Sequence, residues 1–214
     1  YSSWTPRKNT LRYSGYHELA YLHPDYFQPC IETAIKNGLA PSTDNFLIRV
    51  VAWNANHDIG EEHWTTELLS KIVDYLGTFG QVIISSECEL PEQFDDLRYK
   101  GQVSEMHHVM AYCRAYIGES ATMASEAAVL GVPALYVAKT GRGYTTEQEH
   151  LYGLVKNIVD LDWSVVKSVI SSVLNQDSEY YQRKKVSMLC DTVDVAEFVA
   201  ELINDYPHST KYSH

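Results

Sequence analysis

The stretch GESATMASEAAVLGVPAL, residues 118–135, is built almost entirely from small side chains and carries one carboxylate in its middle, Glu126. The apolar run AYIG leads into it and is typical of a short buried strand. The alanines favour a slim helix after the turn, and Gly131 with Pro133 beyond it is typical of a helix end. The stretch therefore predicts a strand, a tight turn and a helix that packs closely on a sheet.

The same alternation of strands and helices continues on both sides of this stretch. Short apolar or β-branched runs predict strands at 46–53 (FLIRVVAW), 81–86, 99–102, 115–118 and 134–138. Apolar positions at helical spacing predict further helices at 61–75, 103–113, 163–174 and 179–204. This rhythm predicts an α/β fold, in which right-handed β-α-β units form a Rossmann-like parallel sheet with helices on both faces.

The alternation occupies 46–205, which we expect to be one Rossmann-like domain. Residues 1–45 lack clear periodicity, are interrupted by prolines and carry several tyrosines, which favours a connecting segment that packs against the domain. Residues 206–214 read as a polar tail. Because the chain begins with Tyr1 instead of Met, we expect it to be a piece of a longer protein.

The composition narrows the class of protein. Of 214 residues, 45% are hydrophobic, which supports a packed core, and the formal charge of −11 argues against a nucleic-acid-binding protein. No apolar run approaches the roughly 20 residues of a transmembrane helix, and no secretory signal is visible. The four cysteines are far apart without a C-x-x-C motif, so we expect buried free thiols in a reducing cytoplasm.

The turn at the start of the small-residue helix offers a site for an anion. Backbone N–H groups at a helix start are unpaired, and the small residues Ser120, Ala121 and Thr122 would let a phosphate approach them. Glu126 lies on the same helix face as Thr122, about one turn (~5.4 Å) further on, where ribose hydroxyls could satisfy its carboxylate. Ordinary helix–sheet packing is the alternative, and neither a dinucleotide-binding nor a P-loop signature is present.

The stretch also resembles known families. It is similar to the donor-site segment in the C-terminal half of GT-B glycosyltransferases and of UDP-N-acetylglucosamine 2-epimerases. More closely, the segments YHELAYLHPDYF (16–27), SEMHHVMAYCRAYIGES (104–120), TMASEAAVLGVPA (122–134) and HLYGLV (150–155) resemble the prokaryotic family called domain of unknown function 354.

The resemblance implies a role for individual residues. Ser120, Ala121 and Thr122 match the diphosphate turn, Glu126 matches the acid that binds ribose, and Gln148 falls near glutamines that contact the donor sugar. It implies a nucleotide sugar, UDP-linked, as substrate, and no metal or other cofactor. It also implies two Rossmann-like halves with the ligand between them, of which this chain is the C-terminal half; the acceptor side then lies in a missing N-terminal half.

Other polar residues follow the predicted strands. Lys139 and Arg142, in a loop with two glycines, either close over a diphosphate or stay in solvent. His107 is either a packed or surface histidine or a catalytic group that faces the cleft. His57, in the loop after the first strand, is the other catalytic candidate; alternatively it contacts a sugar or partner half or joins a metal cluster.

Two acids after the second strand, Glu87 and Glu89, are either an acid–base pair or part of a solvated loop. Three functions remain open at this point: a nucleotide-sugar transferase, a 2-epimerase or hydrolase that acts on UDP-N-acetylglucosamine, and a Rossmann-like binding or assembly module without catalysis.

Overall fold

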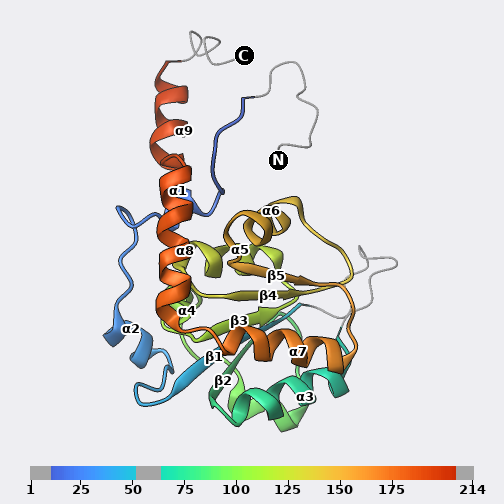
Figure 1. Cartoon of the computed structure of the whole chain (residues 1–214). Helices are drawn as coiled ribbons and strands as arrows, with labels where there is room; N and C mark the ends of the chain where they lie inside the picture. The colour runs from blue at the N-terminus through green and yellow to red at the C-terminus, as the bar shows by residue number, and fades with distance from the viewer. Residues whose placement is uncertain (1–10, 52–63, 206–214) are drawn as a thin grey trace.

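The computed structural model of the chain describes residues 11–51 and 64–205 (Figure 1). The strands are β1 (Asp44–Val50), β2 (Gly80–Ser86), β3 (Ala115–Gly118), β4 (Ala134–Val137) and β5 (Val155–Ile158). The α-helices are α1 (Leu19–Leu22), α2 (Ile31–Lys36), α3 (Thr66–Gly77), α4 (Met106–Met110), α5 (Ala121–Leu130), α6 (Gly143–Glu147), α7 (Trp163–Leu174), α8 (Ser178–Asp191) and α9 (Val195–Asn204). The shorter helical turns are η1 (Glu92–Leu97), η2 (Val103–Glu105) and η3 (Gln148–Tyr152).

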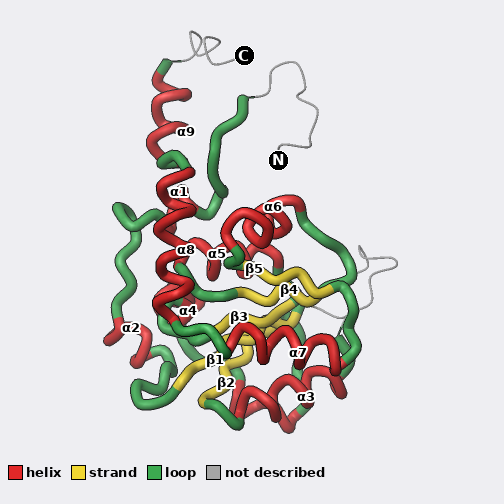
Figure 2. The backbone as a smooth tube through the Cα atoms, in the orientation of Figure 1, coloured by secondary structure: helices red, strands yellow, loops and turns green. Residues whose placement is uncertain are grey.

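The five strands form one sheet in the order β2-β1-β3-β4-β5, and every pair of neighbours is parallel. The chain builds β1 and β2, crosses back over β1, and then adds β3, β4 and β5 on the other side. The sheet lies between helices in Figure 2. α3 packs against β2 and α7, whereas α5 packs against β3, β4, α4 and α6, so the two helix groups cover opposite faces. The predicted α/β fold is confirmed.

The core explains why these segments fold as they do. Phe46, Leu47 and Ile48 of β1 are fully buried because this interior strand, between β2 and β3, is covered on both faces. On α3, Leu69 and Ile72 are fully buried, and the Thr65 side chain accepts a hydrogen bond from the backbone of Leu68 as the N-cap.

The small-residue helix α5 begins and ends as its sequence predicts. Ser120 is its N-cap, and Gly131 ends it in the left-handed conformation with φ of 79°. A Cβ atom on Gly131 would also lie 2.7 Å from Nε2 of Gln182, on helix α8. Glycine is therefore required both by the backbone conformation and by the close approach of α8.

Some boundaries differ from the sequence prediction. The predicted strand 99–102 is wrong: Arg98 makes a single bridge to Ile84, and the chain then turns, closed by the Tyr99 hydroxyl that donates to the carbonyl of Gln102. The helix predicted at 103–113 is shorter and is split into η2 and α4. The helix predicted at 179–204 is two helices, because Thr192 is extended and Asp194 caps a new helix. The edge strand β5 was not predicted.

The cysteines are also partly different from expectation. All four are free thiols, but only Cys113 is fully buried; Cys30 and Cys88 are half-buried and Cys190 is exposed. No helix in the described ranges is both long and apolar enough to cross a membrane.

The described part of the segment before β1, residues 11–43, packs on the domain. Leu19 and Leu22 of α1 are buried in the core, and α1 contacts α5 and α9. Further toward the N-terminus, the chain runs beside α9 (Figure 1), where the rings of Tyr13 and Phe198 lie 5.5 Å apart. Residues 44 and 45, at the end of the predicted connecting segment, already belong to β1.

Candidate functional site

The strand order defines where a ligand would bind in this sheet. After β1 the chain leads to α3 on one face, and after β3 it leads to α5 on the other face. The carboxyl ends of β1 and β3 therefore form the topological switch point, where open α/β sheets bind their ligands. Within the register, Arg49 of β1 lies opposite Gly118 of β3 at this point. His57, in the loop after β1, lies outside the described residues.

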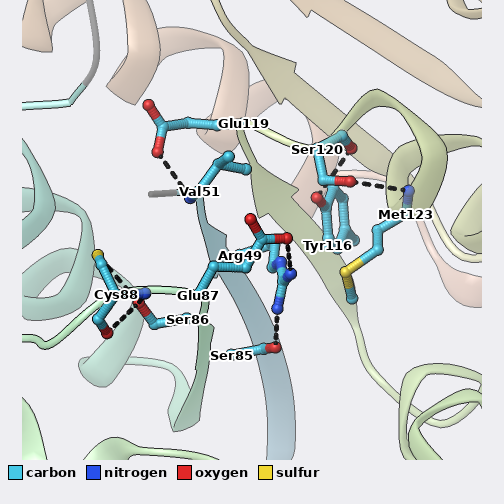
Figure 3. Close-up of polar contacts among 10 residues, drawn as sticks. All are labelled: Arg49, Val51, Ser85, Ser86, Glu87, Cys88, Tyr116, Glu119, Ser120 and Met123. Carbon is cyan, nitrogen blue, oxygen red and sulfur yellow. Dashed lines mark hydrogen bonds and ion pairs between the residues drawn. The ribbon is translucent and has the colours of Figure 1, made fainter. Parts of the chain in front are cut away.

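The start of α5 lies at the switch point, and Figure 3 shows its N-cap residue, Ser120, with Met123 and Tyr116. The Ser120 hydroxyl oxygen accepts a hydrogen bond from the amide of Met123 at 3.3 Å, and the first bond within the helix joins the amide of Ala124 to the carbonyl of Ser120. Among the described residues, the amides of Ser120, Ala121 and Thr122 have no protein acceptor. Three successive donors are thus available to an anion at the predicted turn.

Glu119, the residue before this turn, accepts hydrogen bonds from the backbone after β1 and before α3. One carboxylate oxygen of Glu119 accepts from the amide of Val51 at 3.1 Å, and the other accepts from the amide of Trp64 at 3.0 Å. Val51 follows β1 and Trp64 precedes α3, so Glu119 joins both residues to the end of β3; Figure 3 shows the bond to Val51.

Glu126 lies in the second turn of α5 and is 9% exposed. Its Oε1 accepts a hydrogen bond from the Tyr21 hydroxyl at 2.9 Å and lies 3.1 Å from Nε2 of His107. Burial, together with the nearby Glu126 carboxylate, raises the pKa of Tyr21, so its phenol stays a donor at neutral pH. Within the described part of the chain, Oε2 of Glu126 has no partner, which leaves one oxygen for a ligand.

Of the predicted site residues, His107 contacts Glu126. Gln148 instead lies in the interior, and Lys139 and Arg142 lie at the surface. Gln148 is fully buried; its Nε2 donates to the hydroxyl of Ser125 at 2.9 Å, and its Oε1 is buried without a partner among the described residues. Lys139 and Arg142 are exposed in the loop after β4, at the carboxyl edge of the sheet.

Arg49 belongs to the site although sequence analysis did not select it. Its Nη1 donates to the Ser85 hydroxyl at 2.6 Å, and its Nη2 forms an ion pair with Glu87 (Figure 3). Its Nε is buried without a partner among the described residues. A charged residue inside the apolar run FLIRVV was the signal that could have found it. Glu87 and Glu89 are both exposed, and Glu87 pairs with Arg49.

The space around Arg49 depends on Gly118. A Cβ atom on Gly118 would lie 2.6 Å from the Tyr116 hydroxyl oxygen and 2.8 Å from Cβ of Arg49. The Tyr116 hydroxyl donates to the carbonyl of Ser120 at 3.0 Å, and burial raises its pKa well above the ordinary value, so it stays a neutral donor. The absence of a side chain at Gly118 therefore leaves room for the Tyr116 phenol and for Cβ of Arg49.

One group of possible metal ligands lies elsewhere in the described residues, at the start of α9. Ligand atoms of His23, Asp25 and Asp194 lie within 4.8 Å of one another. Both oxygens of Asp194 are already engaged, by the amide of Glu197 at 2.9 Å and the Tyr26 hydroxyl at 2.5 Å. This group is built as a helix cap, and we assign no metal to it.

Comparison with known proteins identifies the fold. No protein-family model matches the sequence, and no curated protein matches it. Among solved structures, the chain is similar to UDP-GlcNAc 2-epimerase from Neisseria meningitidis bound to UDP-GlcNAc, with a TM-score of 0.54 and 13% identity over 82% of this chain and 47% of that one. It is similar to the spinosyn rhamnosyltransferase complexed with spinosyn aglycone, with a TM-score of 0.52 and 15% identity over 79% of this chain and 47% of that one.

The calicheamicin glycosyltransferase CalG4 is a third neighbour, with a TM-score of 0.51 and 16% identity over 78% of this chain and 44% of that one. The chain thus spans about half the length of each of these three proteins. At these identities the likeness concerns the fold alone. This chain has the Rossmann-like α/β fold of a half-domain of GT-B glycosyltransferases and UDP-GlcNAc 2-epimerases.

Proposed function

We propose that this chain is the nucleotide-sugar-binding half of a GT-B-like glycosyltransferase, and that it holds the donor diphosphate at the turn before α5. The observation that carries the proposal is the run of three amides, Ser120 to Thr122, which have no acceptor within residues 11–51 and 64–205 and lie at the switch point of a parallel sheet. The same helix presents Glu126, whose Oε1 is fixed by Tyr21 and His107.

These groups fit a nucleoside diphosphate in one orientation. The helix start carries partial positive charge and favours the diphosphate, while Oε2 of Glu126 accepts from the two ribose hydroxyls. Tyr21 and His107 keep the carboxylate from rotating toward the phosphates. The exposed Lys139 and Arg142 add positive charge at the same edge of the sheet.

The chemistry of transfer would be mainly electrostatic. Donors aimed at the diphosphate stabilise the charge that develops on it as the bond to the sugar breaks. This scheme requires no resident metal. The acceptor side would come from an N-terminal half. A UDP-linked donor, a cytoplasmic location and membership of the family called domain of unknown function 354 belong to the proposal.

Calorimetric titration with UDP, against uridine, AMP and NAD, tests the nucleotide site. We expect UDP to bind, and Glu126→Ala to weaken its binding about tenfold or more, since a hydrogen bond to a charged group contributes ~1.5–3 kcal/mol. Glu201→Ala on α9 is the matched control, because it removes an exposed acid without touching α5. Unchanged affinity in Glu126→Ala would discard the ribose role, and a lack of response to any nucleotide would favour a binding or assembly module without catalysis.

A 2-epimerase or hydrolase is the second candidate, because His107 lies 3.1 Å from Glu126 and such a pair is suited to proton transfer. Incubation of the full-length protein with UDP-N-acetylglucosamine separates the two. Sugar transfer to an acceptor supports the transferase, whereas an epimerised sugar, or UDP released without an acceptor, supports the second candidate.

A further inference from the structure

We infer that Arg49 binds the phosphate groups of the nucleotide sugar, and that the Arg49 guanidinium forms an ion pair with Glu87 when no ligand is bound. The inference rests on the proposed function and adds to it the residue that recognises the charge of the donor. It also assigns Glu87 the role of an internal competitor for the diphosphate.

The position of Arg49 on the sheet is the first argument. Arg49 is the penultimate residue of β1 and lies opposite Gly118, the last residue of β3, so it stands at the switch point itself. The amide of Glu119 donates to the carbonyl of Arg49 at 3.1 Å, which ties the backbone of Arg49 to the chain that turns into α5. The backbone of Arg49 and the amides of Ser120 to Thr122, which have no acceptor among the described residues, therefore flank one point at the edge of the sheet.

The face of the sheet is the second argument. In the parallel register, Arg49, Ser85 and Gly118 are paired positions, so their side-chain positions share one face. The Tyr116 hydroxyl on this face donates to the carbonyl of Ser120, the N-cap of α5. The Arg49 side chain thus lies on the same face of the sheet as that of Tyr116 (Figure 3), and Gly118 places no side chain between β1 and the start of α5.

The incomplete pairing of Arg49 is the third argument. Its side chain is 18% exposed, whereas that of its partner Glu87 is 49% exposed. Ser85 and Glu87 each take one nitrogen, and the buried Nε has no partner among the described residues. A guanidinium presents five N–H donors in a planar fork that matches phosphate oxygens. A diphosphate has more acceptor oxygens than one half-exposed carboxylate, so it can displace Glu87 toward solvent.

A purely structural ion pair would stabilise the fold without distinguishing between ligands. Recognition of phosphate by Arg49 makes a different prediction, since the residue would act on UDP and not on uridine. The ratio of the two affinities is therefore the quantity to measure, because a general loss of structure lowers both.

The test is calorimetric titration of the 214-residue chain and two variants with UDP and with uridine. We expect Arg49→Gln to lower the affinity for UDP about tenfold or more, because a charge-assisted hydrogen bond is lost. The affinity for uridine should change less than about twofold. We expect Glu87→Gln, which keeps the shape but removes the competing charge, to strengthen UDP binding about threefold or more. Circular dichroism and the melting temperature check that each variant is folded.

Each outcome decides the inference. Suppose that UDP binds the unmodified chain. If Arg49→Gln then binds UDP equally well, or if its affinities for UDP and uridine fall by the same factor, Arg49 has no role in phosphate recognition and the proposed function survives. If the unmodified chain binds no UDP, the proposed function and this inference fail together. If Arg49→Gln does not fold, Glu87→Gln decides alone: an unchanged or weaker affinity for UDP overturns the inference.

Discussion

Replacing Gly118 with alanine tests the packing that brings Arg49, Tyr116 and the start of α5 together. The added Cβ would lie 2.6 Å from the Tyr116 hydroxyl oxygen and 2.7 Å from the carbonyl oxygen of Arg49. The phenol can move only by giving up its bond to the carbonyl of Ser120, and the Arg49 carbonyl belongs to β1, a strand hydrogen-bonded on both sides. Overpacking costs about 1–3 kcal/mol and a lost hydrogen bond about 0.5–1.5 kcal/mol, so we expect Gly118→Ala to lower the free energy of unfolding by roughly 2–4 kcal/mol.

Urea unfolding followed by circular dichroism measures this cost. In a Tyr116→Phe background the nearest clashing atom is absent, so we expect Gly118→Ala to cost about 1 kcal/mol less there, while the clash with Arg49 remains. Gly77→Ala is the control, because nothing lies within 4 Å of its added Cβ, and alanine at the end of α3 should be neutral or up to about 1 kcal/mol stabilising. A Gly118→Ala protein as stable as the unmodified chain would refute the close packing described at the switch point.

Further predictions concern ionisation, thiol access and helix capping. Burial raises the pKa of the Glu18 carboxyl, so its contribution to stability is greatest below the unfolded-state pKa, about 4.3, and is lost as pH rises through the folded-state pKa. Glu18→Gln should therefore raise the melting temperature at pH 7 and not at pH 4. An equal gain at both pH values would contradict this. Burial raises the pKa of Cys113 to about 12. A thiol reagent at pH 8 should therefore label the exposed Cys190 in the native protein and Cys113 only on unfolding. Labelling of Cys113 in the native protein would contradict its burial. Asp162 caps α7 by accepting from the amide of Ser164 at 2.8 Å, so Asp162→Ala should lower the free energy of unfolding by about 1 kcal/mol in urea, and no change would remove the cap from the account.

Sequence pattern predicted the central elements because their burial is nearly complete. The apolar residues of β1 and β2 lie in the interior, and the helical spacing at 163–174 coincides with the bounds of α7. The edge strand β5 escaped prediction because Lys156 and Asn157 at its centre are only half-buried and polar. Asn157 is held by the Glu149 carboxylate, and that side-chain contact has no signature in the strand itself.

Some features of the candidate site could likewise be predicted from the sequence, and others could not. The cap at Ser120 and the face shared by Thr122 and Glu126 follow from spacing along one helix, so they could be predicted. The partners of Glu126 could not, because Tyr21 lies 105 residues away in sequence and approaches only in the folded chain. Arg49 meets Gly118 only through the strand register, and no local pattern specifies which strands become neighbours.

The account depends most on the amides that begin α5. Backbone nuclear magnetic resonance of the ¹⁵N-labelled chain during titration with UDP, with uridine as the phosphate-free control, reports on these groups directly. We expect the amide signals of Ser120, Ala121 and Thr122 to show the largest shifts with UDP and little change with uridine. Unchanged signals from these three residues in a chain that binds UDP would place the diphosphate elsewhere and contradict the proposed site.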